Sequence, residues 1–276
     1  MKNRHLSCAS MKKKRHCVLM LLLIGGCISA GAVCVYMAIS EELPYKQAKA
    51  SYDSLRSAAV TLPLERENQQ ENNEILNRQI DFELLKEKNE DIIAWLYIPD
   101  TQVDYPICRG EDDTYYLHHN AQKESNILGA LFCSSENDAD LTDPHLIIYG
   151  HNMRQGQMFG ELSNYEEVDF LQQQPYVYLY TPDEENVYQI YSVYRCEPSD
   201  DTYTTGFMFR TKSYMDWLNE TLTKEIYETG AEQMVNAGQQ VLTLSTCADG
   251  DRKDRLVVNC VEVDKDDGQK RTEREY

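Results

Sequence analysis

The sequence predicts a mainly β domain that closes into an eight-stranded barrel, with one helix before the first strand and one long helix between late strands. Short runs rich in β-branched and aromatic residues recur after residue 80, and Pro, Gly and Asp interrupt them as they do between strands. Few helical patterns separate these runs, and such an order is typical of a closed barrel. The predicted strands are Ala94–Ile98, Asp104–Cys108, Ala130–Cys133, Leu146–Tyr149, Tyr176–Thr181, Val187–Cys196, Val241–Ser245 and Leu256–Val263.

Two stretches of the chain carry apolar residues at helical spacing. The first, from Phe82 to Ile92, precedes the first strand and predicts the N-terminal helix of the domain. The second runs from Thr211 to about Tyr227 and predicts the long helix that interrupts the strands. The apolar stripe of this second helix is formed by Met215, Leu218, Leu222 and Ile226.

An uncharged apolar run from Val18 to Ile39 predicts a transmembrane signal anchor, because about 20 such residues span a bilayer core. Basic residues 12–15 precede the run and acidic residues 41–42 follow it, so the positive-inside rule places the N-terminus in the cytoplasm. The alternatives are a cleaved signal peptide with its site near 29–32 and a lipoprotein cleavage box at residues 24–27. The anchor is favoured because the apolar run continues well past Cys27.

The predicted organisation has five parts. They are a basic cytoplasmic tail (1–17), the anchor (18–39), a polar extracellular stalk (40–79), the globular domain (80–265) and a polar C-terminal tail (266–276). The stalk favours helix and has no strand pattern, although a disordered linker is equally compatible with it. We therefore expect a single-pass protein of the cell membrane with its domain outside.

Charge divides the chain at the predicted membrane. The formal net charge is −19, yet residues 1–40 contain basic and no acidic side chains, so the acidic excess lies outside. Such a surface repels nucleic acid and anionic lipid, which excludes them as partners of the domain.

The nine cysteines divide in the same way. Five fall on the predicted extracellular side of the membrane. The number is odd, so at least one of them is free unless it pairs with another chain. They show neither CxxC nor zinc-ligand spacing, and we expect no metal or other cofactor. Four of the five lie in or beside apolar runs, which predicts buried packing: Cys108, Cys133, Cys196 and Cys260.

The fifth cysteine, Cys247, ends a predicted strand and is a candidate nucleophile. His151 also ends a strand, and two strand ends at one rim of a barrel can bring thiol and imidazole together for acid–base chemistry. Arg255 opens the next strand, and a hairpin would return its fixed charge to the thiol to stabilise an oxyanion. Taken singly, Cys247 reads as a structural cysteine, His151 as a surface histidine and Arg255 as an edge charge.

The chain resembles a class B sortase over roughly Ile80 to Val263, with the anchor upstream. The late helix before Val241 matches the long helical insertion typical of that class. The resemblance rests on the motifs TLSTC (243–247), RLVV (255–258) and YGHNM (149–153), with support from WLYIP (95–99) and DYPI (104–107).

This resemblance implies a sortase β-barrel and a cysteine transpeptidase on the outer face of a Gram-positive membrane. Such enzymes cut a C-terminal sorting signal after Thr, typically of the Asn-Pro-x-Thr type in class B, hold it as a thioester, and transfer it to a peptidoglycan amine. By motif position Cys247 is the nucleophile, His151 the general acid/base and Arg255 the oxyanion stabiliser. Implied substrate-binding residues are Ser245, Thr246, Tyr116, Leu117 and Tyr203, with Asp249 as an auxiliary acidic position.

Three alternatives remain open from the sequence. An extracellular cysteine peptidase would use the same chemistry and release its product to water. A membrane-anchored assembly protein would carry the motifs without catalysis. Within the family, a housekeeping or pilin-polymerising sortase is the rival, and the late helix together with the YGHNM motif favours class B.

Overall fold

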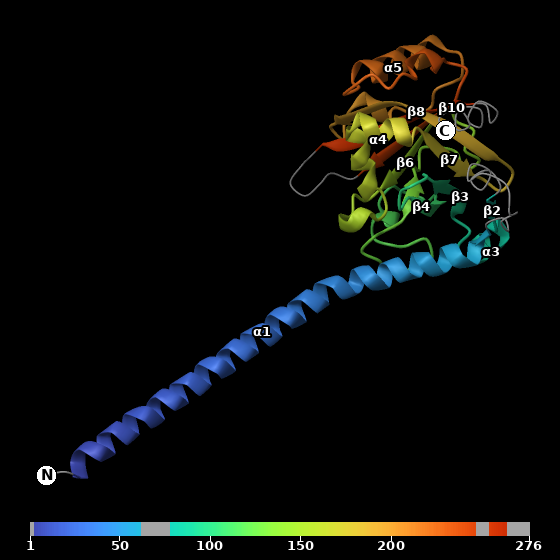
Figure 1. The fold of residues 1–276 in the computed structure, drawn as a ribbon. Coiled ribbons are helices and arrows are strands. Elements are labelled where there is room, and N and C mark those ends of the chain that lie inside the picture. The colour runs from blue at the N-terminus through green and yellow to red at the C-terminus, as the bar shows by residue number, and fades with distance from the viewer. Residues whose placement is uncertain (1–2, 62–77, 247–253, 264–276) are drawn as a thin grey trace, which may run out of the picture. The chain divides into compact units, whose positions relative to one another are not determined.

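A computed structural model describes residues 3–61, 78–246 and 254–263 of the chain. Eight strands close into a barrel in the order β10-β8-β7-β3-β4-β5-β6-β9 (Figure 1). All eight were predicted from the sequence, and their ends differ from the prediction by at most two residues. The strands are β3 (Ile92–Tyr97), β4 (Asp104–Cys108), β5 (Leu131–Cys133), β6 (His145–Gly150), β7 (Tyr176–Tyr180), β8 (Glu185–Cys196), β9 (Val241–Thr246) and β10 (Arg255–Val263).

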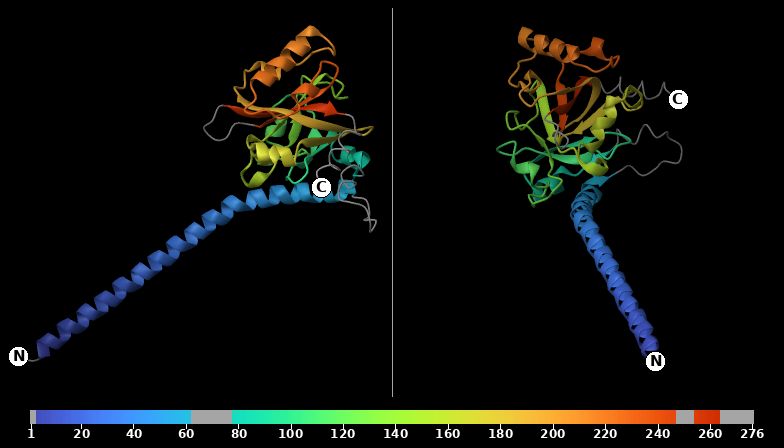
Figure 2. Two further views of the ribbon diagram at one scale, coloured as in Figure 1. Left: turned by 45° about the horizontal axis from the view of Figure 1, so that its top comes forward. Right: turned by 90° about the vertical axis from the view of Figure 1, so that its left-hand side faces the viewer.

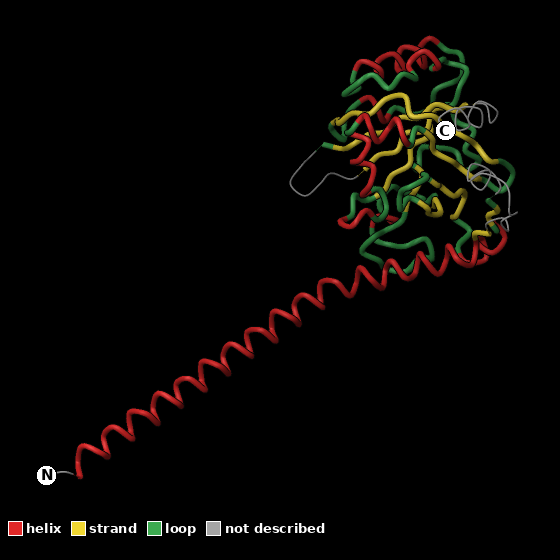
Figure 3. Tube along the Cα trace, viewed as in Figure 1, coloured by secondary structure: helices red, strands yellow, loops and turns green. Residues whose placement is uncertain are grey.

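The barrel mixes antiparallel and parallel pairs. Strands β4 and β5 pair in parallel, as do β6 and β9, and the other neighbours are antiparallel. Parallel neighbours need long connections, and the chain between β6 and β9 builds β7, β8 and the late helix before it returns. The tube in Figure 3 shows these strands at the centre, with helices and loops around them.

The core extends to both faces of several strands. Every residue of β7 and every residue of β9 is buried, so these strands lack the alternation of a half-exposed sheet. The outer cover includes the 3-10 helix η3 (Gly160–Glu166) and the helix α5 (Lys212–Thr223), which lies over the barrel in Figures 1 and 2. The remaining short elements are η1 (Tyr115–Leu117), η2 (Arg154–Gly156), α4 (Val168–Gln173), η4 (Asp201–Tyr203) and η5 (Glu232–Met234).

The two helices predicted for the domain are present and are shorter than expected. Helix α3 (Phe82–Lys88) is capped by the Asp81 carboxylate, and it stops before Ile92 because that residue begins β3. Helix α5 ends at Thr223, and the amide of Ile226 instead donates to the Val193 carbonyl of β8 at 2.9 Å. Ile226 is therefore 48% exposed rather than part of the helix's apolar face.

The four cysteines expected in the interior are all buried and free of disulfides, which confirms that part of the analysis. Burial raises the pKa of each thiol, to about 12 for Cys133. These four sulfurs are therefore neutral at physiological pH and unsuited to nucleophilic attack.

Helix α1 (Asn3–Ala59) precedes the short strands β1 (Val60–Thr61) and β2 (Gln79–Ile80), which pair with each other. The chain divides into two compact units, Met1–Gln47 and Ala48–Tyr276. The unit that contains the barrel thus begins at Ala48, whereas the sequence analysis placed the start of the domain at residue 80. Among the described residues, none of the helices combines the length and apolarity needed to cross a membrane. The anchor over residues 18–39 stays a prediction, and the C-terminal tail 266–276 lies outside the described residues.

Candidate active site

The parallel pair β6–β9 brings the two predicted catalytic segments to the same rim of the barrel. Their register runs from His145 opposite Val241 to Gly150 opposite Thr246. His151 follows Gly150 directly, and Cys247 follows Thr246 directly in the sequence. Cys247 itself lies outside the described residues, but the strand that leads to it ends beside the strand that leads to His151.

The ring of His151 is held by a main-chain contact. Its Nε2 lies 2.7 Å from the carbonyl oxygen of Leu117, and since a carbonyl oxygen accepts, Nε2 carries the proton. In the neutral ring Nδ1 then holds the lone pair, which is the state a general base requires. The side chain is half-buried just past the end of β6.

Arg255 is the first residue of β10 and reaches the end of β9. Its Nη1 donates to the carbonyl oxygen of Thr246 at 3.4 Å. Because β9 and β10 are antiparallel, the chain leaves β9 at Thr246 and re-enters the sheet at Arg255. The guanidinium therefore lies against the residue that precedes Cys247, where a permanent positive charge favours a thiolate and an oxyanion.

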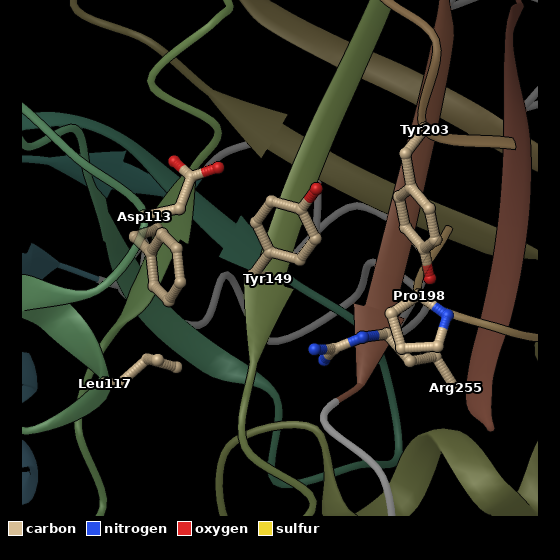
Figure 4. Close-up of a pocket in the computed structure, with 7 residues that line it drawn as sticks. Asp113, Leu117, Tyr149, Pro198, Tyr203 and Arg255 are labelled. Carbon is tan, nitrogen blue, oxygen red and sulfur yellow. The ribbon is translucent and has the colours of Figure 1, made fainter. Parts of the chain in front are cut away.

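A pocket of about 220 Å³ opens next to Arg255. Figure 4 shows Arg255 and Asp113 on opposite sides of Tyr149, with the guanidinium directed toward the middle of the pocket. Burial raises the pKa of the Tyr149 and Tyr203 hydroxyls, so both stay protonated and can donate hydrogen bonds. The lining residues are Asp113, Leu117, Phe132, Tyr149, Pro198, Tyr203 and Arg255.

Tyr203 is held in the pocket wall from behind. Its hydroxyl lies 2.9 Å from Ser245 Oγ and 3.7 Å from Cys196 Sγ. Ser245 is fully buried, so it supports Tyr203 and does not itself line the pocket. Thr246 is also buried, and its hydroxyl accepts from the Leu256 amide at 3.3 Å while its carbonyl accepts from Arg255.

The structure separates the two adjacent residues that were both expected to bind substrate. Leu117 lines the pocket, and its carbonyl holds His151. Tyr116 points into the interior, where its hydroxyl donates to the Asp91 carboxylate at 2.6 Å and accepts from Asn89 at 2.9 Å. Tyr116 is therefore an interior residue, and Asp249 lies outside the described residues.

The pocket contains residues that sequence reasoning missed. Tyr149 belongs to the quoted YGHNM motif. It lies near the end of β6, two residues before His151, and this position already indicated the same rim of the barrel. Asp113, Phe132 and Pro198 come from three separate segments, and they meet here through the closure of the barrel. Local patterns do not carry that information.

The comparisons with known proteins agree with this geometry. A family model described as the sortase domain matches residues 96–263, which is more than half of the chain. The chain belongs to the sortase family. Sortases are cysteine transpeptidases.

The relatives also agree on the class. Sortase B of Listeria monocytogenes is 36% identical over 165 residues, which cover 59% of this chain and 65% of that protein. Sortase B of Staphylococcus aureus is 25% identical over 214 residues, covering 78% and 83%. The structure of a mutant form of Clostridium perfringens sortase B superposes with a TM-score of 0.65 at 30% identity, covering 78% of this chain and 97% of that one. The class B resemblance and the closed eight-stranded barrel are thus confirmed.

Proposed function

We propose that this sortase cleaves a C-terminal sorting signal of a surface protein after Thr and transfers the new carboxyl terminus to a peptidoglycan amine. The observation that supports it most is the register of β6 and β9, which ends the two strands side by side ahead of His151 and Cys247. The contact of Arg255 with the Thr246 carbonyl adds the fixed charge that the reaction needs.

The reaction follows from these positions. His151 first takes the proton of the Cys247 thiol. The resulting thiolate attacks the carbonyl carbon of the Thr residue, and a C–S bond forms while Arg255 stabilises the oxyanion. Collapse of the intermediate breaks the C–N bond, and His151 protonates the departing amine. An acceptor amine then attacks the thioester and gives a proton to His151. A new C–N bond forms, the C–S bond breaks, and the thiolate is restored.

The pocket supports a short extended peptide as the substrate. Leu117 and Tyr203 offer apolar walls, and the tyrosine hydroxyls can donate to peptide carbonyls. We propose a signal of the Asn-Pro-x-Thr type, since the relatives are sortase B proteins.

We also propose that the enzyme is held at the outer face of a Gram-positive membrane by residues 18–39. The basic residues ahead of this uncharged run support this orientation. The acidic domain would then face the cell wall, where both the surface protein and the amine acceptor are found.

The test is cleavage of an Asn-Pro-x-Thr-Gly peptide by the full-length chain in detergent micelles, with and without triglycine as acceptor. Mass spectrometry should find the Thr carboxyl joined to triglycine when the acceptor is present. Cys247→Ala should abolish cleavage, whereas Cys260→Ala should keep it, because the Cys260 thiol is buried and neutral.

Two results would contradict the proposal. Release of the free acid at an unchanged rate whatever the triglycine concentration would indicate a cysteine peptidase. Absence of cleavage across a peptide library of sorting signals would indicate a non-catalytic assembly protein.

A further inference from the structure

The last three turns of helix α1, residues 48–59, form a docking segment that packs against the barrel. This segment lies within the same compact unit as the barrel. Its inward residues recur every three or four positions, which is one face of a helix. They are Ala48, Tyr52, Leu55 and Ala59, each at most 6% exposed.

The docking segment contacts the chain that seats the catalytic histidine. His151 Nε2 contacts the Leu117 carbonyl at 2.7 Å, and the His151 ring lies next to Gly129, which has room for no side chain on that side. Gly129 has a φ of +60°, and a Cβ there would meet the Leu117 carbonyl oxygen at 2.9 Å and the His151 Cδ2 at 3.1 Å. We call Leu117 and Gly129 the histidine seat, because any displacement of either one moves the imidazole.

Tyr52 connects the docking segment to this seat. Its hydroxyl donates to the carbonyl oxygen of Gly129 at 2.5 Å and accepts from the amide of Ala121 at 3.2 Å. The side chain is 4% exposed, so the bond to Gly129 is shielded from water. One hydroxyl of the N-terminal helix thus fixes the backbone of Gly129, which lies beside the His151 ring.

A second route leads from Tyr52 to the other side of His151. The ring of Tyr52 packs edge-on against Tyr105, with centroids 5.3 Å apart. Burial raises the pKa of the Tyr105 hydroxyl, and the nearby backbone of Met158 acts in the opposite direction. The next amide, Phe159, donates to the carbonyl oxygen of His151 at 2.9 Å. The docking segment therefore packs next to two segments that contact His151, the one that contains Gly129 and the one that contains Phe159.

Arg56 fastens the docking segment one turn further along. Its guanidinium donates to the Asp104 carbonyl at 2.9 and 3.0 Å and pairs with the Asp104 carboxylate at 3.0 Å. Asp104 begins β4 and also accepts from the indole of Trp95 at 2.7 Å. The helix is consequently fixed to the barrel wall at this end, which holds Tyr52 against the seat.

We propose that the docking segment positions the catalytic histidine, with Tyr52 as the positioning residue that acts through Gly129. The proposal rests on the function proposed above, in which His151 exchanges protons with the substrate. A displacement of about 1 Å in a catalytic group can cost about 100-fold in rate. The helix that leads into the predicted membrane anchor is then part of the enzyme's proton-transfer machinery rather than a spacer.

The test compares Tyr52→Phe with Tyr214→Phe in the full-length chain. Tyr214 is a matched control: its buried hydroxyl also donates to a backbone carbonyl, that of Pro144 at 2.6 Å, and it lies on α5 away from the pocket lining. Two kinds of measurement are made on each variant. They are kcat and KM for peptide cleavage, and the pH midpoint of Cys247 alkylation by iodoacetamide, followed by mass spectrometry of the Cys247 peptide.

Tyr52→Phe should lower kcat about tenfold or more with KM within about twofold, and should move the alkylation midpoint. Tyr214→Phe should change neither quantity. Unchanged kcat and midpoint in Tyr52→Phe, or equal changes in both variants, would overturn the inference. If the chain cleaves no peptide at all, the pH midpoint of Cys247 alkylation alone decides. A shift of this midpoint in Tyr52→Phe and not in Tyr214→Phe supports the inference. An unshifted midpoint in Tyr52→Phe overturns it.

Arg56→Gln is a second variant that tests the role of the docking segment without changing Tyr52. This substitution loosens the docking segment without altering the histidine seat, so it should lower kcat as Tyr52→Phe does. A folded Arg56→Gln variant, judged by its thermal transition, that retains full kcat and the parental midpoint would also count against the proposal.

Discussion

The two ends of strand β6 each carry a histidine, and the two side chains have opposite surroundings. His145 opens the strand and is 1% exposed; its Nδ1 contacts the Thr204 carbonyl and its Nε2 contacts Thr243 Oγ1, both at 2.8 Å. His151 follows the strand and is half-buried at the pocket rim. The same residue type on one strand therefore serves the interior at one end and the proposed chemistry at the other.

The difference comes from what packs over each end. The indole of Trp217 lies 4.2 Å from the ring of His145, centroid to centroid, because α5 covers that part of the barrel. The other end of β6 is left beside the pocket, next to the ends of β9 and β10. The surroundings of each histidine thus depend on the end of β6 at which it lies, and not on its neighbours in the sequence.

The largest effect should come from removing the imidazole at the pocket end. His151→Gln should lower kcat/KM of peptide cleavage by about 10²- to 10⁴-fold, because a general acid/base contributes that much. His119→Gln is the matched control, since its ring is also half-buried and also contacts a backbone carbonyl, that of Tyr115 at 2.9 Å. Similar losses in both variants would remove the distinction between the pocket end of β6 and an ordinary surface histidine.

The next effect concerns the covered end and appears as a pH dependence of stability. Burial lowers the pKa of His145 from 6.5 to about 4, against smaller opposing contributions from the Thr204 carbonyl and Asp143. The unfolded chain takes up a proton near pH 6.5 and the folded chain does not, so stability is full above that pH. It should fall by about 3 kcal/mol as the pH drops from 6.5 to 4.

Urea unfolding followed between pH 7 and 4 measures this slope. His145→Gln should be less stable at neutral pH and should lose most of the slope above pH 5. If the free energy of unfolding of His145→Gln depends on pH as steeply as that of the parent, other groups cause the acid sensitivity and His145 is only a packing residue.

The smallest effect should come from the wall of the pocket. Tyr203→Phe removes the hydroxyl that bonds Ser245 at 2.9 Å, and the free energy of unfolding should fall by about 1 kcal/mol. Chemical denaturation at pH 7 is sufficient to measure it. A loss as large as that of the buried His145 variant would mean that the pocket end is as tightly packed as the covered end.

The sequence was sufficient to place all eight strands, because β-branched runs and turn residues are local signals. It also pointed to His151 and Arg255 as strand-end residues. It did not yield Asp113, Phe132 or Pro198, which reach the pocket from distant segments. Such meetings depend on the pairing of strands far apart in the chain.

The docking segment is a different kind of omission. Residues 40–79 were interpreted as a polar stalk, yet Tyr52, Leu55 and Ala59 lie on one helical face and are buried. The sequence shows this helical spacing, but the polar residues around it favoured the interpretation as a stalk.

The parallel pairing of β6 with β9 has a consequence for biogenesis. The chain between them supplies β7, β8 and α5, so the two strand ends become neighbours after a long stretch has been threaded into place. Contacts of such high sequence separation form slowly. The ends of β6 and β9 would therefore lie apart until the barrel closes, so the proposed pair of His151 and Cys247 would form late in folding.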